Sequence, residues 1–149
     1  MKGWMLYACL SAVFAGLTAV LAKVGVEHVP SNLATLVRTV VILAFAAGIV
    51  VVRGEAHLVS SFTGRNWAFL VLSGIATGLS WLFYFAALKA GPISGVAPID
   101  KLSFLIAMAL GFLVLREPIK PLTLVGAALI AAGVLLTLPA VQEALRPRA

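Results

Sequence analysis

The sequence predicts an all-α integral membrane protein, folded as a bundle of five transmembrane helices. Hydrophobic residues make up 62% of the 149 residues and charged residues 11%, whereas soluble domains have about 45–50% and 25%. A soluble domain of this length would leave about a third of its unfolded-state surface in water, and here that surface would be largely aliphatic. Uncharged stretches of the length that crosses a bilayer also recur along the chain.

The first expected helix covers residues 3–22, an apolar stretch bounded by Lys2 and Lys23. A cleaved signal peptide is the alternative, because the residues before Cys9 resemble a lipoprotein cleavage box. The apolar stretch before Cys9 is too short for a signal core, and the uncharged run continues well beyond it. We therefore expect a retained transmembrane helix.

The second expected helix covers residues 32–52 and carries one charge, Arg38. It follows Ser31, a residue type that commonly starts helices. The hydrophilic stretch 54–66 comes next and is expected to be a solvated loop. His57 lies in this stretch, and an exposed loop histidine indicates no particular chemistry.

The third expected helix covers residues 67–88 and is uncharged. Trp81 and Tyr84 lie near its far end, where they are either interfacial anchors or walls of a pocket for an organic solute. Trp4 and Tyr7, at the start of the first expected helix, are better explained as interfacial anchors.

The fourth expected helix covers residues 92–115. Its uncharged part, 102–115, is too short to cross a bilayer, so the helix has to include the apolar residues before it. Asp100 and Lys101 then lie inside the span, and Pro98 interrupts its hydrogen bonding.

The fifth expected helix covers residues 121–138 and is followed by a polar tail. No internal repeat is visible in the sequence, so residues 1–149 are expected to form a single transmembrane domain. Each expected helix also contains small residues four apart, which allow close helix approach in lipid. These pairs are Ala12 with Gly16, Ala44 with Gly48, Gly74 with Gly78, Ala107 with Gly111, and Ala128 with Ala132. We expect Gly74, Gly78, Gly126, Ala128, Ala132 and Gly133 to serve helix packing or dimer formation.

Several function classes are disfavoured. The net charge of +6 and pI near 10.1 suggest nucleic-acid binding only where basic residues gather on one face, and here they are dispersed between apolar runs. We see no set of residues with metal-ligand spacing, no nucleophile with a paired base and no phosphate-binding loop. We therefore expect no nucleic-acid partner, no metal, no cofactor and no enzymatic activity.

The distribution of basic residues does not favour either orientation in the membrane. If five helices cross, the N-terminal side carries Lys2, Arg53, Arg65, Arg116 and Lys120. The opposite side carries Lys23, Lys89, Arg146 and Arg148. A chain without orientation bias can insert both ways, and two oppositely oriented copies reproduce the inverted repeats of many transporters. We therefore expect an antiparallel homodimer.

The charges within the expected spans are candidates for a substrate or ion pathway, because such charges are costly in lipid. Arg38 and Asp100 lie about 9 Å and 12 Å from the starts of their spans, on the same side, and could pair. Snorkelling to the headgroups is the alternative for Arg38. A first-turn position in a helix that starts near Ala97 is the alternative for Asp100. In the functional interpretation, Asp100 binds a cation or exchanges a proton beside Pro98, and Lys101 points elsewhere.

The chain resembles the EamA domain of the drug/metabolite transporter superfamily over nearly its whole length. The resemblance rests on YFAALK at 84–89, Gly91-Pro92, LREP at 115–118, GAALIAAGV at 126–134, and Pro30 followed by Arg38. Most family members carry two such domains in ten helices, so this chain is similar to a half-size member that works as a dimer. Two departures stand out: Phe104 lies where the family often has a proline, and the Asp100-Lys101 pair is outside the general pattern. The first helix also lacks the acidic residue of small multidrug-resistance proteins, so their proton coupling is not carried over.

The resemblance implies a secondary transporter that moves a metabolite, amino acid or drug by alternating access. We expect a multi-pass protein of the plasma (cytoplasmic) membrane, with lipid and a small-molecule substrate as partners. The alternatives are a non-transporting membrane subunit or assembly factor, and a subunit that flips lipid-linked sugars. Arg38, Asp100, Lys101, Trp81 and Tyr84 are the expected pathway residues.

Overall fold

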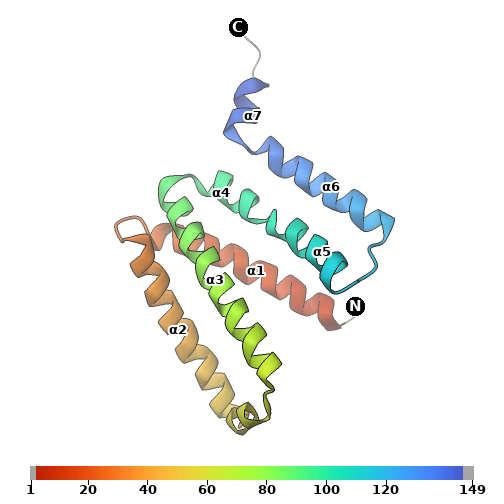
Figure 1. Cartoon of the computed structure of the whole chain (residues 1–149). Helices are drawn as coiled ribbons and strands as arrows, with labels where there is room; N and C mark the ends of the chain where they lie inside the picture. Colours follow the sequence, from red (N-terminus) through yellow and green to blue (C-terminus); the bar gives the residue numbers. More distant parts are fainter. Residues whose placement is uncertain (1–2, 146–149) are drawn as a thin grey trace. The chain divides into compact units, whose positions relative to one another are not determined.

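The computed structural model describes residues 3–145, and this part of the chain is helical with no strand. Figure 1 shows the helices in chain order. They form two compact units, one up to Ala90 and one from Gly91 onward.

The first unit contains three long helices, α1 (Gly3–Gly25), α2 (Ser31–Val52) and α3 (Gly64–Ala90). All three are long and apolar enough to cross a membrane, and they contain the residues of the first three expected spans. Helix α3 packs against both α1 and α2, and the short 3-10 helix η1 (Ala56–Ser61) lies in the α2–α3 connection (Figure 1).

Helix α3 begins earlier than the sequence predicts, because the loop ends in a reciprocal cap. The Thr63 backbone N–H donates to Asn66 Oδ1 at 3.0 Å, and the Asn66 backbone N–H donates to Thr63 Oγ1 at 3.2 Å. Such paired bonds satisfy backbone donors in the first turn of a helix. The expected loop 54–66 is therefore shorter and contains a 3-10 helix.

The core of the first unit lies where the end of α1, the start of α2 and the end of α3 come together. Ala19 and Ala22 of α1, Val26 after it, and Phe85 and Leu88 of α3 are buried. Most of the other large apolar side chains are exposed. Lipid tails are as apolar as these side chains, so exposed apolar faces suit helices surrounded by lipid.

Two lysines connect these helix ends. Lys23 Nζ donates a hydrogen bond to the Leu88 carbonyl at 2.5 Å, and Lys89 Nζ donates one to the Val29 carbonyl at 3.2 Å. The last carbonyls of a helix have no partner within the helix. Lys23 of α1 therefore supplies a hydrogen-bond donor for a carbonyl group at the end of α3.

The second unit contains α4 (Ile93–Asp100), α5 (Ser103–Val114), α6 (Pro121–Leu136) and α7 (Pro139–Ala144). Residues Ile93–Val114 have the length and hydropathy of a fourth membrane span, which confirms the expected extension of that helix upstream of the uncharged run. The helix changes at Lys101 and Leu102, where Leu102 N–H bonds to the Ile99 carbonyl, three residues back, at 2.9 Å. The interruption lies after Pro98 and beside the charged pair, not at the proline itself.

Helix α6 has 16 residues and is shorter than the four candidate spans. The expected fifth span ended at Leu138, but α6 ends at Leu136 and the short helix α7 follows. Proline is well suited to the first position of a helix, so Pro139 starts α7. The polar tail expected after residue 138 thus begins with a short helix over residues 139–144.

Candidate functional site

A cavity of about 480 Å³ lies within the first unit. Helices α1, α2 and α3 and the link after α1 supply its walls, which include Thr18, Leu21, Val26, Val37, Arg38 and Phe85. Thr18 and Arg38 are the residues with polar side chains in this lining, and the others are apolar. Ligand pockets are typically of this size and are mostly apolar with few polar groups.

The Arg38 guanidinium lies over two aromatic rings of α3. Its Cζ atom is 4.8 Å from the centre of the Phe85 ring and 5.2 Å from that of the Trp81 ring. A cation over an aromatic face is stabilised by about 0.5–2 kcal/mol. Trp81 and Phe85 are about 14 Å and 8 Å from the end of α3 along its axis. The Arg38 guanidinium therefore lies at the depth of these rings and not at the helix end. This position favours a role in a substrate site over snorkelling to the headgroups.

No carboxylate neutralises this charge in the part of the chain that the structure describes. The side-chain ion pairs of residues 3–145 are Arg53 with Glu55 at 2.7 Å and Lys101 with Asp100 at 3.3 Å. Arg38 therefore brings an uncompensated positive charge to the cavity wall.

The neighbouring hydroxyls of α2 are satisfied locally. Thr35 Oγ1 donates to the Ser31 carbonyl at 2.9 Å, and Thr39 Oγ1 donates to the Thr35 carbonyl at 2.8 Å. Serine and threonine commonly bond to the preceding turn in this way. Neither threonine lines the cavity, and Arg38 is the charged residue that α2 contributes to the lining.

The expected pathway residues divide between the two units. Arg38 and Trp81 come together in the first unit, and the Tyr84 ring lies tilted against Phe85 with centroids 6.1 Å apart. Phe85 was not among the expected site residues. It follows Trp81 by four residues and so lies on the same face of α3, a spacing that the sequence already contains.

Asp100 and Lys101 belong to the second unit. Asp100 is the last residue of α4, which begins at Ile93, so the alternative of a first-turn carboxylate near Ala97 is wrong. The Lys101 ammonium contacts the Asp100 carboxylate, so the expectation that Lys101 points elsewhere is also wrong. Lys101 follows the last helical residue, and its long side chain turns back to its neighbour. The pairing of Arg38 with Asp100 stays a prediction.

The small residues expected at helix contacts lie on open faces. A Cβ atom built on Gly74, Gly78, Gly126 or Gly133 would meet no atom within 4 Å. Ala128 and Ala132 of α6 are exposed. Their role in packing or dimer formation stays a prediction.

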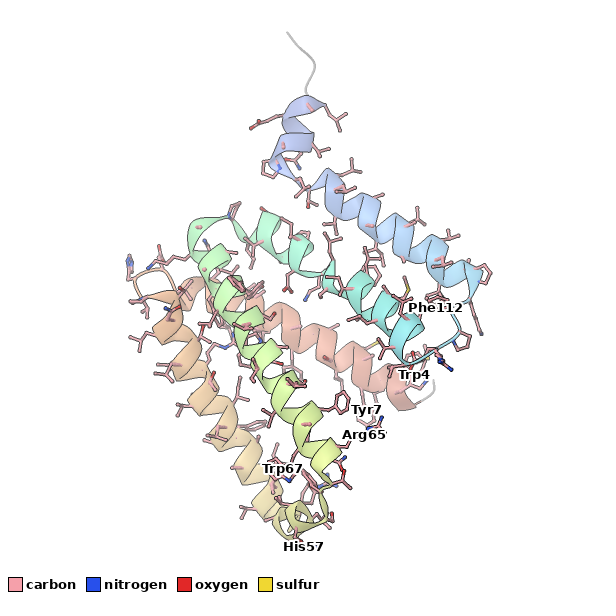
Figure 2. The ribbon with its side chains drawn as sticks, in the orientation of Figure 1. Trp4, Tyr7, His57, Arg65, Trp67 and Phe112 are labelled. Atoms are coloured by element: carbon pink, nitrogen blue, oxygen red, sulfur yellow. The ribbon has the colours of Figure 1, made fainter. Side chains whose placement is uncertain are left out.

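Exposed aromatic residues lie near the helix ends on the other side of the first unit. Figure 2 shows Trp67 and Arg65 at the start of α3, beside the loop that carries His57. The Arg65 guanidinium lies 5.7 Å from the centre of the Phe69 ring. The His57 ring hydrogen-bonds through Nδ1 with the Gly54 carbonyl at 2.8 Å, which gives it a structural role in the loop.

Trp4 and Tyr7 lie near the start of α1 and are exposed (Figure 2). Trp and Tyr concentrate at the membrane–water interface. The position of these residues supports their interpretation as interfacial anchors.

Within the described part of the chain, four apolar helices of spanning length, one of which carries Arg38 within it, indicate a multi-pass membrane protein. The EamA-like transporter family matches residues 2–138, and the chain belongs to this family. The chain is 52% identical over 135 residues to a Sinorhizobium sp protein named "Uncharacterized transporter in cobO 3'region". This match covers 91% of the chain and 96% of the relative. No solved structure matches the chain.

Proposed function

We propose that this protein is a secondary transporter of a small organic solute, which binds in the cavity between α1, α2 and α3. The observation that carries the proposal is the Arg38 guanidinium in the wall of that cavity. A charge within a membrane span is costly and usually belongs to a substrate or ion pathway. The cavity volume of about 480 Å³ is within the usual range for small-molecule sites.

The proposed mechanism is alternating access in a dimer in the plasma (cytoplasmic) membrane. The four candidate spans and the shorter α6 would make five crossings, half of a ten-helix transporter. Transporters commonly rock two repeats around a central site. A second copy would supply the second repeat, and the open small-residue faces of α3 and α6 would supply contact surfaces.

Two other functions make different predictions. A non-transporting subunit or assembly factor needs no solute cavity and would show no flux. A subunit that flips lipid-linked sugars would need many hydrogen-bonding groups for the sugar, whereas this cavity offers Thr18 and Arg38 among apolar residues. Solute uptake is therefore the function that the cavity supports best.

Flux in proteoliposomes tests the proposal. The purified full chain would be reconstituted and its uptake of a panel of radiolabelled amino acids, carboxylates and amines compared with that of empty vesicles. We expect Arg38→Gln to lower uptake by about tenfold or more, equivalent to about 1.4 kcal/mol. Arg65→Gln is the matched control, because it also removes an arginine that lies over an aromatic ring but is not in the cavity wall. Equal uptake by wild type and empty vesicles for the whole panel would reject a transport function.

A further inference from the structure

We propose that the cavity selects organic anions, specifically carboxylates with an apolar body, and that Arg38 binds the carboxylate. This inference rests on the proposed transport function and names the substrate class of the same site. It follows from three properties of the cavity: its charge, its hydrogen-bonding capacity and its apolar walls.

The first property is the sign of the charge. Arg38 is the charged group in the cavity lining, and the acidic side chains of residues 3–145 that form ion pairs pair with Arg53 and Lys101 instead. Arg38 is half-buried, so its charge is screened less than that of a fully solvated group. An anion is therefore favoured beside Arg38 and a cation is opposed.

The second property is the free hydrogen-bonding edge of the guanidinium. The rings of Phe85 and Trp81 interact with it as a cation, but the hydrogen bonds of the described residues include none from its N–H groups. A guanidinium carries five N–H donors in a planar fork that matches the two oxygens of a carboxylate. A bound carboxylate would accept hydrogen bonds from two of these N–H groups bidentately while the rings stay in place.

The third property is the apolar surface around the charge. Leu21 and Val26 line the cavity from the α1 side, and Val37 lines it from α2. A solute that carried only charge would leave these walls without contacts, whereas a carboxylate with a hydrocarbon or aromatic body would cover them. The combination selects an amphipathic anion.

Three probes of one shape test the charge preference: 3-phenylpropanoate, 3-phenylpropanol and 3-phenylpropylammonium. Trp81 is one of three tryptophans in the chain and lies beside Arg38, so it reports binding in a Trp4→Phe, Trp67→Phe background. We expect saturable changes in Trp81 fluorescence, with the carboxylate bound at least tenfold more tightly than the ammonium. Equal binding of the three probes, or tighter binding of the ammonium, would overturn the proposal.

Variants assign the preference to Arg38. Arg38→Gln should abolish the difference between carboxylate and ammonium, Arg38→Lys should retain part of it, and Arg65→Gln should leave it unchanged. The wild-type probe series decides the question even if Arg38→Gln fails to fold. A carboxylate preference that appears only after Asp100→Asn would show that Asp100 neutralises Arg38, and would also overturn the proposal.

Binding and flux separate this inference from the proposed function. Selective binding of 3-phenylpropanoate with no flux of any panel solute would uphold the anion site and reject transport. Arg38-dependent flux of neutral or cationic solutes alone would uphold transport and reject the anion preference.

Discussion

At the scale of single residues, Asp100 occupies a position that its own helix disfavours. It is the last residue of α4, whose negative dipole end repels a carboxylate, while the N-terminus of α5 begins three residues on at Ser103. Lys101 contacts it at 3.3 Å, but both side chains are partly exposed, and ion pairs of this kind stabilise a fold by about 0–1 kcal/mol. The contribution of this ion pair to the stability of the fold is therefore too small to explain why both charges lie within the span.

Asp100→Asn tests whether the carboxylate has a functional role. We expect the free energy of unfolding to change by less than about 1 kcal/mol, because Asn keeps the shape and the pair is exposed. If Asp100 binds a cation or exchanges a proton, uptake in proteoliposomes should fall by about tenfold or more. Unchanged uptake with unchanged thermal stability would remove Asp100 from the pathway.

Arg116 has the backbone conformation of a glycine. Its φ is +56°, just after Leu115 caps α5 with φ −90°. A left-handed residue at this position commonly ends a helix, and glycine adopts it without steric cost. We expect Arg116→Gly to raise the free energy of unfolding by about 0.5 kcal/mol, since strain relief exceeds the added chain entropy.

Leu115→Gly is the control for that change. Leu115 has ordinary right-handed backbone angles, so glycine there should lower stability by about 0.5–1 kcal/mol. Thermal unfolding of the full chain in detergent measures both variants. If both variants unfold at lower temperature than the wild type, the contacts of the Arg116 side chain stabilise the fold by more than its left-handed backbone destabilises it.

At the scale of helices, two lysines differ in what they contribute to the first unit. Lys23 is half-buried and donates to the carbonyl of fully buried Leu88, whereas Lys89 is exposed and donates to Val29. We expect Lys23→Met to cost about 1.5–3 kcal/mol, the range for hydrogen bonds of charged groups. Lys89→Met should cost less than about 1 kcal/mol. A larger loss of thermal stability in Lys89→Met than in Lys23→Met would contradict this order.

The helices were predictable where apolar length alone decides them. Residues 32–52 and 67–88 lie within α2 and α3, because a long apolar run in lipid has to satisfy its backbone hydrogen bonds internally, as a helix does. The ends were less predictable, because local caps such as the Thr63–Asn66 bonds set them. Helix α7 was not predicted, although Pro139 suits the first position of a helix.

The candidate site was only partly predictable. Arg38 stands out in the sequence because it is the single charge of an apolar run. Its partners on α3 depend on how two helices pack, so Trp81 was named for its aromatic character and Phe85 was missed. Asp100 and Lys101 are adjacent in sequence, yet their contact depends on a local helix interruption that Pro98 only suggests.

Helix α6 is shorter than the other expected membrane-crossing helices. Its 16 residues reach about 24 Å, less than the ~30 Å hydrocarbon core, although local thinning of the bilayer can accommodate this difference. In a cysteine-free Cys9→Ser background forced into one orientation by added loop lysines, Ser60→Cys and Gln142→Cys should react with an impermeant maleimide from opposite sides. Reaction of both from the same side would show that α6 does not cross.

At the scale of the whole molecule, the near-equal distribution of basic residues predicts two orientations. With five crossings, the N-terminal side would carry Arg53, Arg65 and three other basic residues against four on the opposite side, so the positive-inside rule gives almost no bias. In intact cells that carry Ser60→Cys in the Cys9→Ser background, we expect roughly half of the copies to react with an impermeant maleimide. Gly54 is a poorer labelling position because its φ is +66°, a conformation that strains cysteine.

Added lysines should then control the ratio of the two membrane orientations, and uptake should require copies in both orientations. Two extra lysines in η1, at Ala56 and Ser61, should retain that loop in the cytoplasm and reduce labelling of Ser60→Cys towards zero. If the working unit is an antiparallel dimer, this fixed form should lose uptake, and co-expression with a copy fixed the other way should restore it. Full uptake by a single fixed orientation would show that the two copies of a dimer need not be inverted, because one orientation alone would then build both halves of the site.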